Sequence, residues 1–174
     1  MYSKIAKLSG DFSCLPEKHI HDGNLEHLQA YVAKLRNAKE KSGSVPPNCV
    51  ILDDLMGELG NYESWFLQFC ATHRHTNTTI ILSTQYIGDS STVFRSICNY
   101  AIFFRQVDKR SLNNLFENFG GYFDNYKAFK KFHDDNLAIE NRKHYCIVYD
   151  RNKYDKNNYM LFKADLKKDF KLNF

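Results

Sequence analysis

The 174-residue sequence predicts an α/β fold, with a mostly parallel sheet flanked by helices and a β-hairpin at the C-terminal end. Three observations support this prediction. Short apolar runs alternate with stretches of helical periodicity between residues 24 and 133. The run at 48–53 is unbroken and apolar, as in a strand buried on both faces. Two further strand-like runs, 145–149 and 159–162, are joined by a polar loop, which is the pattern of a hairpin.

Local signals place the elements in order. Residues 1–22 are expected to be irregular, and Asp22-Gly23-Asn24 is a helix start, from which apolar residues recur at helical spacing to about residue 41. The run at 41–47 contains two prolines, which bar further helix. The remaining elements are expected to be strand 48–53, helix 62–72, strand 78–84, helix 92–98, strand 100–104, helix 108–118, helix 122–133 and the hairpin.

The length predicts a single domain. We divide it into an N-terminal irregular segment and helix (1–44), a core of strands and helices (45–120), and a final helix and hairpin (121–174). Right-handed crossovers are expected to place the carboxyl ends of the first three strands at one edge of one parallel sheet.

Charge is distributed unevenly along the chain. Residues 1–104 carry 9 basic and 10 acidic side chains, whereas residues 105–174 carry 15 and 10. This basic excess indicates either a polyanionic partner or a solvated, lysine-rich surface. No apolar run is long enough to predict a membrane span, and no secretory signal is visible at the N-terminus. The five dispersed cysteines predict reduced thiols and an intracellular, non-secreted protein.

Polar side chains of fixed type follow two of the predicted strands. Asp53 and Asp54 close the strand at 48–53, and Gln85 follows the strand at 78–84. In parallel-sheet nucleotide hydrolases, one such acid holds Mg²⁺ through water and a second polarises the attacking water, while a neighbouring amide donates to the γ-phosphate and accepts from that water. Asp53 fits the first role, Asp54 the second and Gln85 the third. Taken singly, an apolar run followed by two aspartates is more often a strand whose acids cap the next helix or face solvent, and Ser-Thr-Gln alone is equally weak evidence.

Together, the segments 50–55 and 72–85 resemble the genome-packaging ATPases of large DNA viruses, of the poxvirus type, in the FtsK–HerA superfamily of P-loop ATPases. That family carries an Arg-His pair before a strand that ends in Ser-Thr-Gln, and Arg74-His75 and Thr84-Gln85 hold those places here. The stretch 93–99 resembles the family's arginine followed by an asparagine and the next strand, with Arg95 as the arginine. The resemblance covers about residues 45–120 well and the C-terminal hairpin loosely, and residues 1–44 match no motif of the family.

This resemblance implies ATP hydrolysis, with ATP and Mg²⁺ as cofactors, coupled to the translocation of double-stranded DNA into a capsid. It further implies a homo-oligomeric ring, contacts with capsid or portal-vertex proteins, and a location in the host-cell cytoplasm (the viral factory) or the virion. In such rings an arginine of one subunit reaches the nucleotide of its neighbour. Arg74 and Arg95 are the candidates for that role, and a structural salt bridge is the alternative for each.

The phosphate-binding loop of this family, G-x-x-x-x-G-K-[ST], does not occur in the sequence. We therefore interpret the chain as an incomplete P-loop NTPase domain that lacks the first strand, the loop and the following helix. Very weak ATP affinity and no turnover are expected from the chain alone, because the loop supplies most of the phosphate binding. A truncated product, a split gene and a degenerate relative that only binds all remain open.

A second hypothesis is a non-catalytic nucleic-acid-binding or assembly subunit derived from such an ATPase. The basic excess of residues 105–174 and the Tyr and Phe residues interleaved with it support this alternative. An open sheet that lacks a central strand is also expected to expose apolar edges, which favours pairing with another chain or aggregation.

Overall fold

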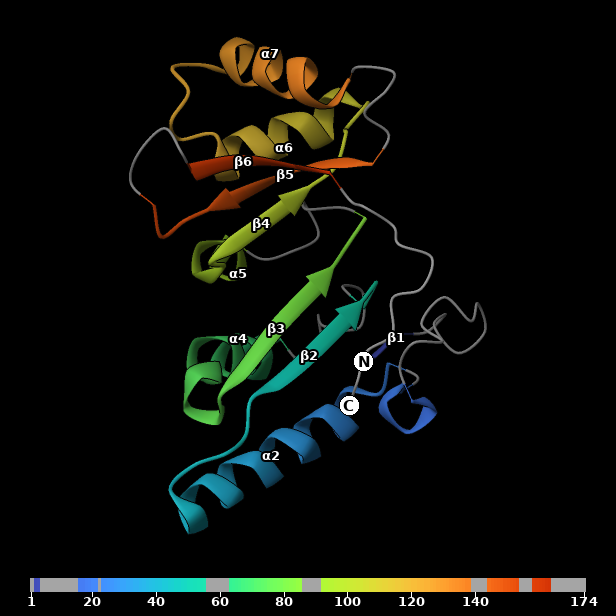
Figure 1. Cartoon of the computed structure of the whole chain (residues 1–174), viewed down its shortest axis with the longest axis vertical. Helices are drawn as coiled ribbons and strands as arrows, with labels where there is room; N and C mark the ends of the chain where they lie inside the picture. The colour runs from blue at the N-terminus through green and yellow to red at the C-terminus, as the bar shows by residue number, and fades with distance from the viewer. Residues whose placement is uncertain are drawn as a thin grey trace. The chain divides into compact units, whose positions relative to one another are not determined.

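The computed structural model describes residues 2–3, 16–21, 23–55, 63–85, 92–138, 144–153 and 158–163. The described residues up to 85 form one compact group, which we call unit 1, and those from 92 onward form a second group, which we call unit 2. The boundary falls within the segment 45–120 that the sequence analysis treats as one core. Figure 1 labels the helices and strands of both units.

Unit 1 contains a parallel sheet of three strands in the order β1-β2-β3. The strands are β1 (Tyr2–Ser3), β2 (Asn48–Asp53) and β3 (Thr78–Ser83). β2 and β3 pair in register over their full length, from Asn48 opposite Thr78 to Asp53 opposite Ser83. Both long strands match their predicted positions. The short β1 and the 3-10 helix η1 (Glu17–His19) lie in the stretch that was expected to be irregular, so that expectation was wrong there.

The first long helix of unit 1, α2 (Leu25–Ser42), has clear signals at both ends. Asn24 caps its start, because the side-chain oxygen accepts a hydrogen bond from the backbone N–H of His27 at 3.1 Å. Gly43 ends it in the left-handed region, with φ of 74°, which glycine adopts without steric cost. Its N–H donates to the carbonyl of Lys39. The helix start predicted at Asp22-Gly23-Asn24 is confirmed at Asn24.

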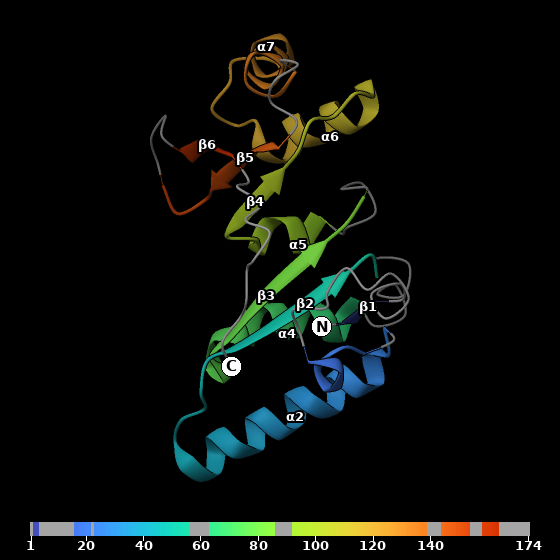
Figure 2. The same cartoon turned by 45° about the vertical axis from the view of Figure 1, so that its right-hand side comes forward.

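α4 (Glu63–Thr72) and the 3-10 turn η3 (His73–Thr76) connect the two long strands of unit 1. Figures 1 and 2 show α2 and α4 running beside the β2–β3 pair. The buried side chains of the unit come from all these elements: Leu28 and Val32, Val50 and Leu52, and Phe66 and Phe69. This shared core fixes the strand ends relative to the helices.

Unit 2 contains an antiparallel sheet in the order β4-β5-β6. Its elements are α5 (Thr92–Ile97), β4 (Tyr100–Phe103), α6 (Lys109–Phe119), α7 (Tyr126–Leu137), β5 (Tyr145–Asp150) and β6 (Tyr159–Lys163). The predicted C-terminal hairpin is confirmed as β5 and β6.

The expectation that the strand at 100–104 joins the parallel sheet was wrong, because β4 pairs antiparallel with β5. The pairing sets Phe103 opposite Ile147, and both side chains are buried in one apolar cluster. The same cluster includes Phe129 of α7, and Figure 1 shows α6 and α7 on one side of this sheet. Burial of these side chains together therefore favours the pairing with β5.

α7 begins and ends four residues later than predicted, at Tyr126 and Leu137 instead of 122 and 133. The cause is Asn125, whose side-chain oxygen accepts a hydrogen bond from the N–H of Ala128 at 3.0 Å and so sets the first turn. α6 begins as predicted, because Asp108 accepts from the N–H of Ser111 at 2.8 Å.

Candidate functional site

The carboxyl edge of the unit 1 sheet brings the predicted site residues together. Asp53 is the last residue of β2 and pairs with Ser83, the last residue of β3. Asp54 follows directly, and its N–H donates to the carbonyl of Ser83 at 3.1 Å, which continues the strand pairing by one residue. The strand ends therefore stay together where the polar side chains emerge.

Asp54 and Gln85 are in direct contact. The side-chain Nε2 of Gln85 donates to Oδ2 of Asp54 at 3.2 Å, and both residues are exposed to solvent. Because the amide uses a nitrogen for this bond, its oxygen stays available as an acceptor. The expected convergence of the acids and the glutamine at one edge is confirmed for β2 and β3.

The backbone at Asp54 has a conformation that the sequence motif alone does not reveal. Its φ is 52°, in the left-handed region that aspartate and asparagine tolerate better than other residues with a Cβ. The next residue, Leu55, is completely buried. The left-handed residue thus turns the chain sharply, so that the acid faces solvent while the following side chain enters the core.

The donor set at this edge suits a magnesium ion shared with a substrate. Mg²⁺ prefers oxygen ligands and keeps several of its waters, so one or two carboxylates are a sufficient protein share. Within the described ranges, no group of three or more His, Cys, Asp or Glu side chains is placed to hold a metal ion. Asp53 and Asp54 therefore fit an ion held partly by phosphate oxygens and water, and do not form a complete cage.

The opposite end of the strand pair is tied by a separate set of hydrogen bonds. Asn48, at the start of β2, accepts from the hydroxyl of Tyr31 at 2.7 Å and donates to the carbonyls of Pro46 and Thr76. His73 contacts the carbonyl of Thr78 through Nδ1 at 2.6 Å. These contacts hold the amino ends of the strands, at the end of the sheet opposite to Asp53 and Asp54.

Arg74 lies at that opposite end. It belongs to η3, before β3 begins, whereas Gln85 follows the end of β3. A strand of six residues spans about 20 Å, so Arg74 is far from the acids of its own chain. Its side chain is exposed, and no carboxylate of the described residues forms an ion pair with it. Arg74 is therefore placed away from the acids and the glutamine of its own chain.

Arg95 lies in α5 of unit 2 and contacts α6. Its Nε donates to Oδ1 of Asn118 at 2.7 Å. The carbonyls of Arg95 and Ser96 accept in turn from the guanidinium of Arg151, at 3.0 and 2.9 Å. These bonds join α5 to α6 and to the end of β5, which gives the Arg95 side chain a structural role inside unit 2.

The part of the chain that the structure describes contains no helix that is long and apolar enough to cross a membrane. No family model matches the sequence, and no curated protein matches it.

Solved structures do match the fold. One is the genome packaging NTPase B204 from Sulfolobus turreted icosahedral virus 2 in complex with AMPPCP, with a TM-score of 0.58, 16% identity and 84% of this chain covered. The same protein in complex with ATP-gammaS gives a TM-score of 0.57, 18% identity and 83% coverage. B204, the DNA-packaging ATPase from Sulfolobus turreted icosahedral virus, gives 0.53, 18% and 78%.

These matches span 67%, 65% and 62% of the respective B204 chains, so about a third of each neighbour has no counterpart here. At this level of identity the likeness shows a shared fold. The chain therefore shares the mixed α/β fold of these structures, in agreement with the fold class predicted from the sequence.

Proposed function

We propose that this chain is a viral DNA-packaging ATPase, or the piece of one that holds the acids and the glutamine used in hydrolysis. One observation carries the proposal: Asp54 and Gln85 meet at the carboxyl edge of a parallel strand pair, in a fold shared with genome-packaging NTPases. Ligands of open parallel sheets bind at such edges.

Each of the three side chains has a separate proposed role. Asp53 holds Mg²⁺ through water, and the ion would neutralise charge on the phosphate oxygens of ATP. Asp54 accepts a proton from the attacking water or polarises it. Gln85 orients the same water through its amide oxygen, because its nitrogen is bonded to Asp54.

The proposed cofactors are ATP and Mg²⁺, with phosphate binding completed by a loop that this sequence does not contain. The proposed substrate is double-stranded DNA, and the proposed partners are further copies in a ring and capsid or portal-vertex proteins. We further propose that the protein acts in the cytoplasm of an infected cell or in the virion, where DNA would be packaged. The poxvirus-type affiliation belongs to the same proposal.

In a ring, Arg74 is the better candidate for the arginine that reaches a neighbouring nucleotide. It is exposed and lies at the end of the sheet away from its own acids, whereas Arg95 is bonded to Asn118. An arginine supplied by a neighbour accelerates phosphoryl transfer by roughly 10³–10⁵.

The test is ATP hydrolysis by this chain, alone and joined to the polypeptide encoded directly upstream of it. We expect Mg²⁺-dependent turnover only from the joined protein, because the upstream segment is expected to supply the phosphate-binding loop. Asp54→Asn should lower kcat about 10²- to 10⁴-fold, since a general base is lost while the side-chain shape is kept.

Asp124→Asn is the matched control, because Asp124 is an exposed acid in unit 2. It should leave kcat unchanged. Equal turnover by the two variants would show that the edge of β2 and β3 does not carry the chemistry.

A further inference from the structure

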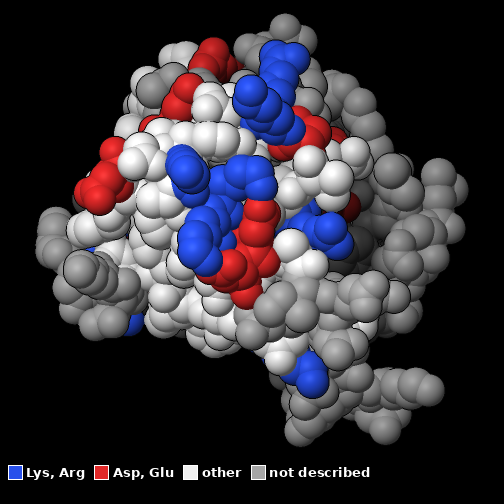
Figure 3. Space-filling model, turned by 90° about the horizontal axis from the view of Figure 1, so that it is seen from above, with Lys and Arg blue, Asp and Glu red and all other residues white. Residues whose placement is uncertain are grey.

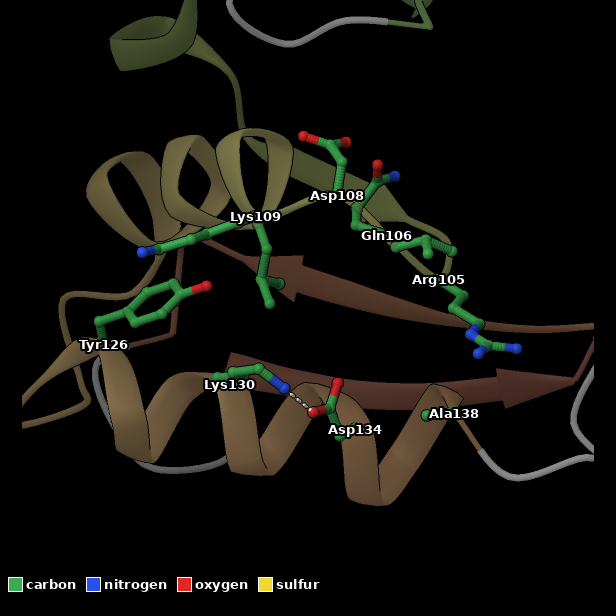
Figure 4. Close-up of a pocket in the computed structure, with 10 residues that line it drawn as sticks. Arg105, Gln106, Asp108, Lys109, Tyr126, Lys130, Asp134 and Ala138 are labelled. Atoms are coloured by element: carbon green, nitrogen blue, oxygen red, sulfur yellow. Dashed lines mark hydrogen bonds and ion pairs between the residues drawn. The ribbon is translucent and has the colours of Figure 1, made fainter.

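Unit 2 contains a groove that the proposed hydrolysis does not use. It is a cavity of about 450 Å³ between the segment that follows β4, residues 105–109, and helix α7. Figure 4 shows this segment on one side and α7 on the other. Three cationic side chains line the groove, namely Arg105, Lys109 and Lys130, together with two carboxylates, Asp108 and Asp134.

Both carboxylates already have partners inside the protein. Asp108 caps α6 by accepting from the N–H of Ser111 at 2.8 Å, and hydrogen bonding from the side chain and the backbone of Ser111 lowers the pKa of its carboxyl group. Asp134 accepts from the ammonium group of Lys130 and from Nδ1 of His133. Both carboxylate groups of the groove therefore already accept hydrogen bonds from groups of the protein.

Two of the cationic side chains lack an ion pair with a carboxylate of the described residues. These are Arg105 and Lys109, and both are exposed. In Figure 4, the Lys109 side chain extends toward the Tyr126 end of the groove and Arg105 toward the Ala138 end. Figure 3, which views the molecule of Figure 1 from above, shows Lys and Arg side chains next to Asp and Glu side chains on that face.

The segment that carries these cations is fixed to α7. His133 is completely buried, and its Nε2 accepts a hydrogen bond from the backbone N–H of Gln106 at 3.1 Å. The same ring contacts Asp134 through Nδ1 at 3.0 Å. The backbone beside Arg105 is thus held in place before any ligand arrives, which reduces the entropy lost on binding.

We propose that this groove binds the phosphodiester backbone of duplex DNA. The choice of double-stranded DNA as the polyanion rests on the proposed function, whereas the groove and its charges do not. Two cations without a carboxylate partner, one toward each end of the groove, match the regularly spaced phosphates of a duplex.

The lining argues against the two other obvious ligands. Its one aromatic residue, Tyr126, packs edge-on against Phe116 with ring centroids 5.9 Å apart. Because the Tyr126 ring packs in this way, it does not offer a free face on which an unpaired base could stack. The apolar residues offer no pocket to anchor a peptide side chain, since Leu112 is buried in the core and Val107 is 86% exposed.

The test is the binding of a fluorescein-labelled 20-base-pair duplex by the full chain without nucleotide, followed by fluorescence anisotropy at several salt concentrations. We expect a Kd of roughly 10⁻⁴–10⁻⁶ M at physiological salt for this sequence-independent contact. The double variant R105Q/K109Q should weaken binding roughly tenfold or more, and should lower the slope of log K against log salt by about 2.

The matched control is K34Q/K41Q, which removes the same charge from exposed positions of α2 in unit 1. It should keep the wild-type salt slope. A third variant, D134N, should strengthen binding by about threefold or more, because it removes a negative charge and releases Lys130 while its amide oxygen still accepts from His133.

Circular dichroism melting of each variant checks that the fold is retained. Equal losses of DNA affinity in R105Q/K109Q and K34Q/K41Q would overturn the proposal, since only the net charge of the protein would then determine binding. Weaker binding by D134N, or tighter binding of poly-glutamate or single-stranded DNA than of the duplex, would also overturn it. Because no ATP is present, the outcome is independent of whether the chain takes part in hydrolysis.

Discussion

The side-chain nitrogen of Gln85 lies 3.2 Å from Oδ2 of Asp54, and this bond joins residues that are 31 positions apart in the sequence. It forms because β2 and β3 are parallel neighbours in register, so both chains leave the sheet at the same edge. A glutamine that donates to one acid keeps its own oxygen for a second partner. The contact between Asp54 and Gln85 thus follows directly from the pairing of the two strands.

The left-handed backbone at Asp54 gives the first prediction. A β-branched residue is strongly disfavoured at a φ of 52°, whereas asparagine and glycine adopt it easily. Asp54→Val should therefore lower the free energy of unfolding by about 1–2 kcal/mol. Asp54→Asn should change it by less than about 0.5 kcal/mol. Urea denaturation checks both values, and equal stability of the two variants would contradict the described turn.

The aromatic core of unit 2 gives the second prediction. Phe129 is completely buried, and its ring contacts those of Phe103, Phe116 and Phe123. Phe129→Ala should cost about 3–5 kcal/mol through lost burial and a cavity. Val107→Ala is the comparison, because Val107 is 86% exposed, and it should stay within about 0.5 kcal/mol. Thermal or urea unfolding distinguishes the two, and a small effect at Phe129 would count against the packing of α7.

Tyr159 gives a prediction about pH. Burial, with the nearby Tyr149 as a second cause, raises the pKa of its hydroxyl well above the ordinary value of 10.0, and the hydroxyl donates to the carbonyl of Phe119. A pKa raised by folding contributes stability that is complete below pH 10 and is lost as the pH rises further. Wild-type stability should therefore fall above pH 10. Tyr159→Phe should be about 1 kcal/mol less stable at neutral pH and fall less steeply in alkali. If the free energy of unfolding fell equally steeply above pH 10 in wild type and Tyr159→Phe, the role given to the Tyr159 hydroxyl would be refuted.

Exposed apolar side chains on strands at the edge of a sheet lead to a prediction about association. Ile102 of β4, an edge strand of the unit 2 sheet, is 61% exposed, and Ile81 of β3, an edge strand of the unit 1 sheet, is 47% exposed. Unprotected edges favour pairing with another chain. Ile102→Lys should reduce concentration-dependent association in light scattering. Val107→Lys adds the same charge away from a strand, and an equal reduction by that variant would mean that charge alone is responsible.

Much of this architecture could be predicted from the sequence because its signals are local. The caps Asn24 and Asp108, the β-branched run of β3 and the apolar run of β2 set their elements without help from distant residues. The convergence of Asp54 and Gln85 could also be predicted, since it needs only parallel pairing of two successive strands.

Other features depend on contacts between distant residues and could not be predicted. The predicted pairing of β4 with the parallel sheet was wrong, because an apolar run does not specify which strand it pairs with. Burial of Phe103 beside Ile147 favours the pairing with β5. The groove of unit 2 was foreseen only as a basic excess in the sequence. The (i, i+4) spacing of Lys130 and Asp134 was a readable helix signal. The hydrogen bond from the N–H of Gln106 to the buried ring of His133 could not be predicted from the sequence.

The proposed function requires the carboxyl edge of β2 and β3 to bind a divalent ion that carries a nucleotide. Its most direct test is nuclear magnetic resonance of the full chain with a non-hydrolysable ATP analogue and Mn²⁺ in place of Mg²⁺, because paramagnetic broadening reports proximity even when binding is weak. We expect broadening of the amides of Ser83 and Gln85, little effect at Asn48 and Thr78, and loss of the effect in Asp53→Asn. Equal broadening at both ends of the strands, or broadening that persists in Asp53→Asn, would contradict the proposed function.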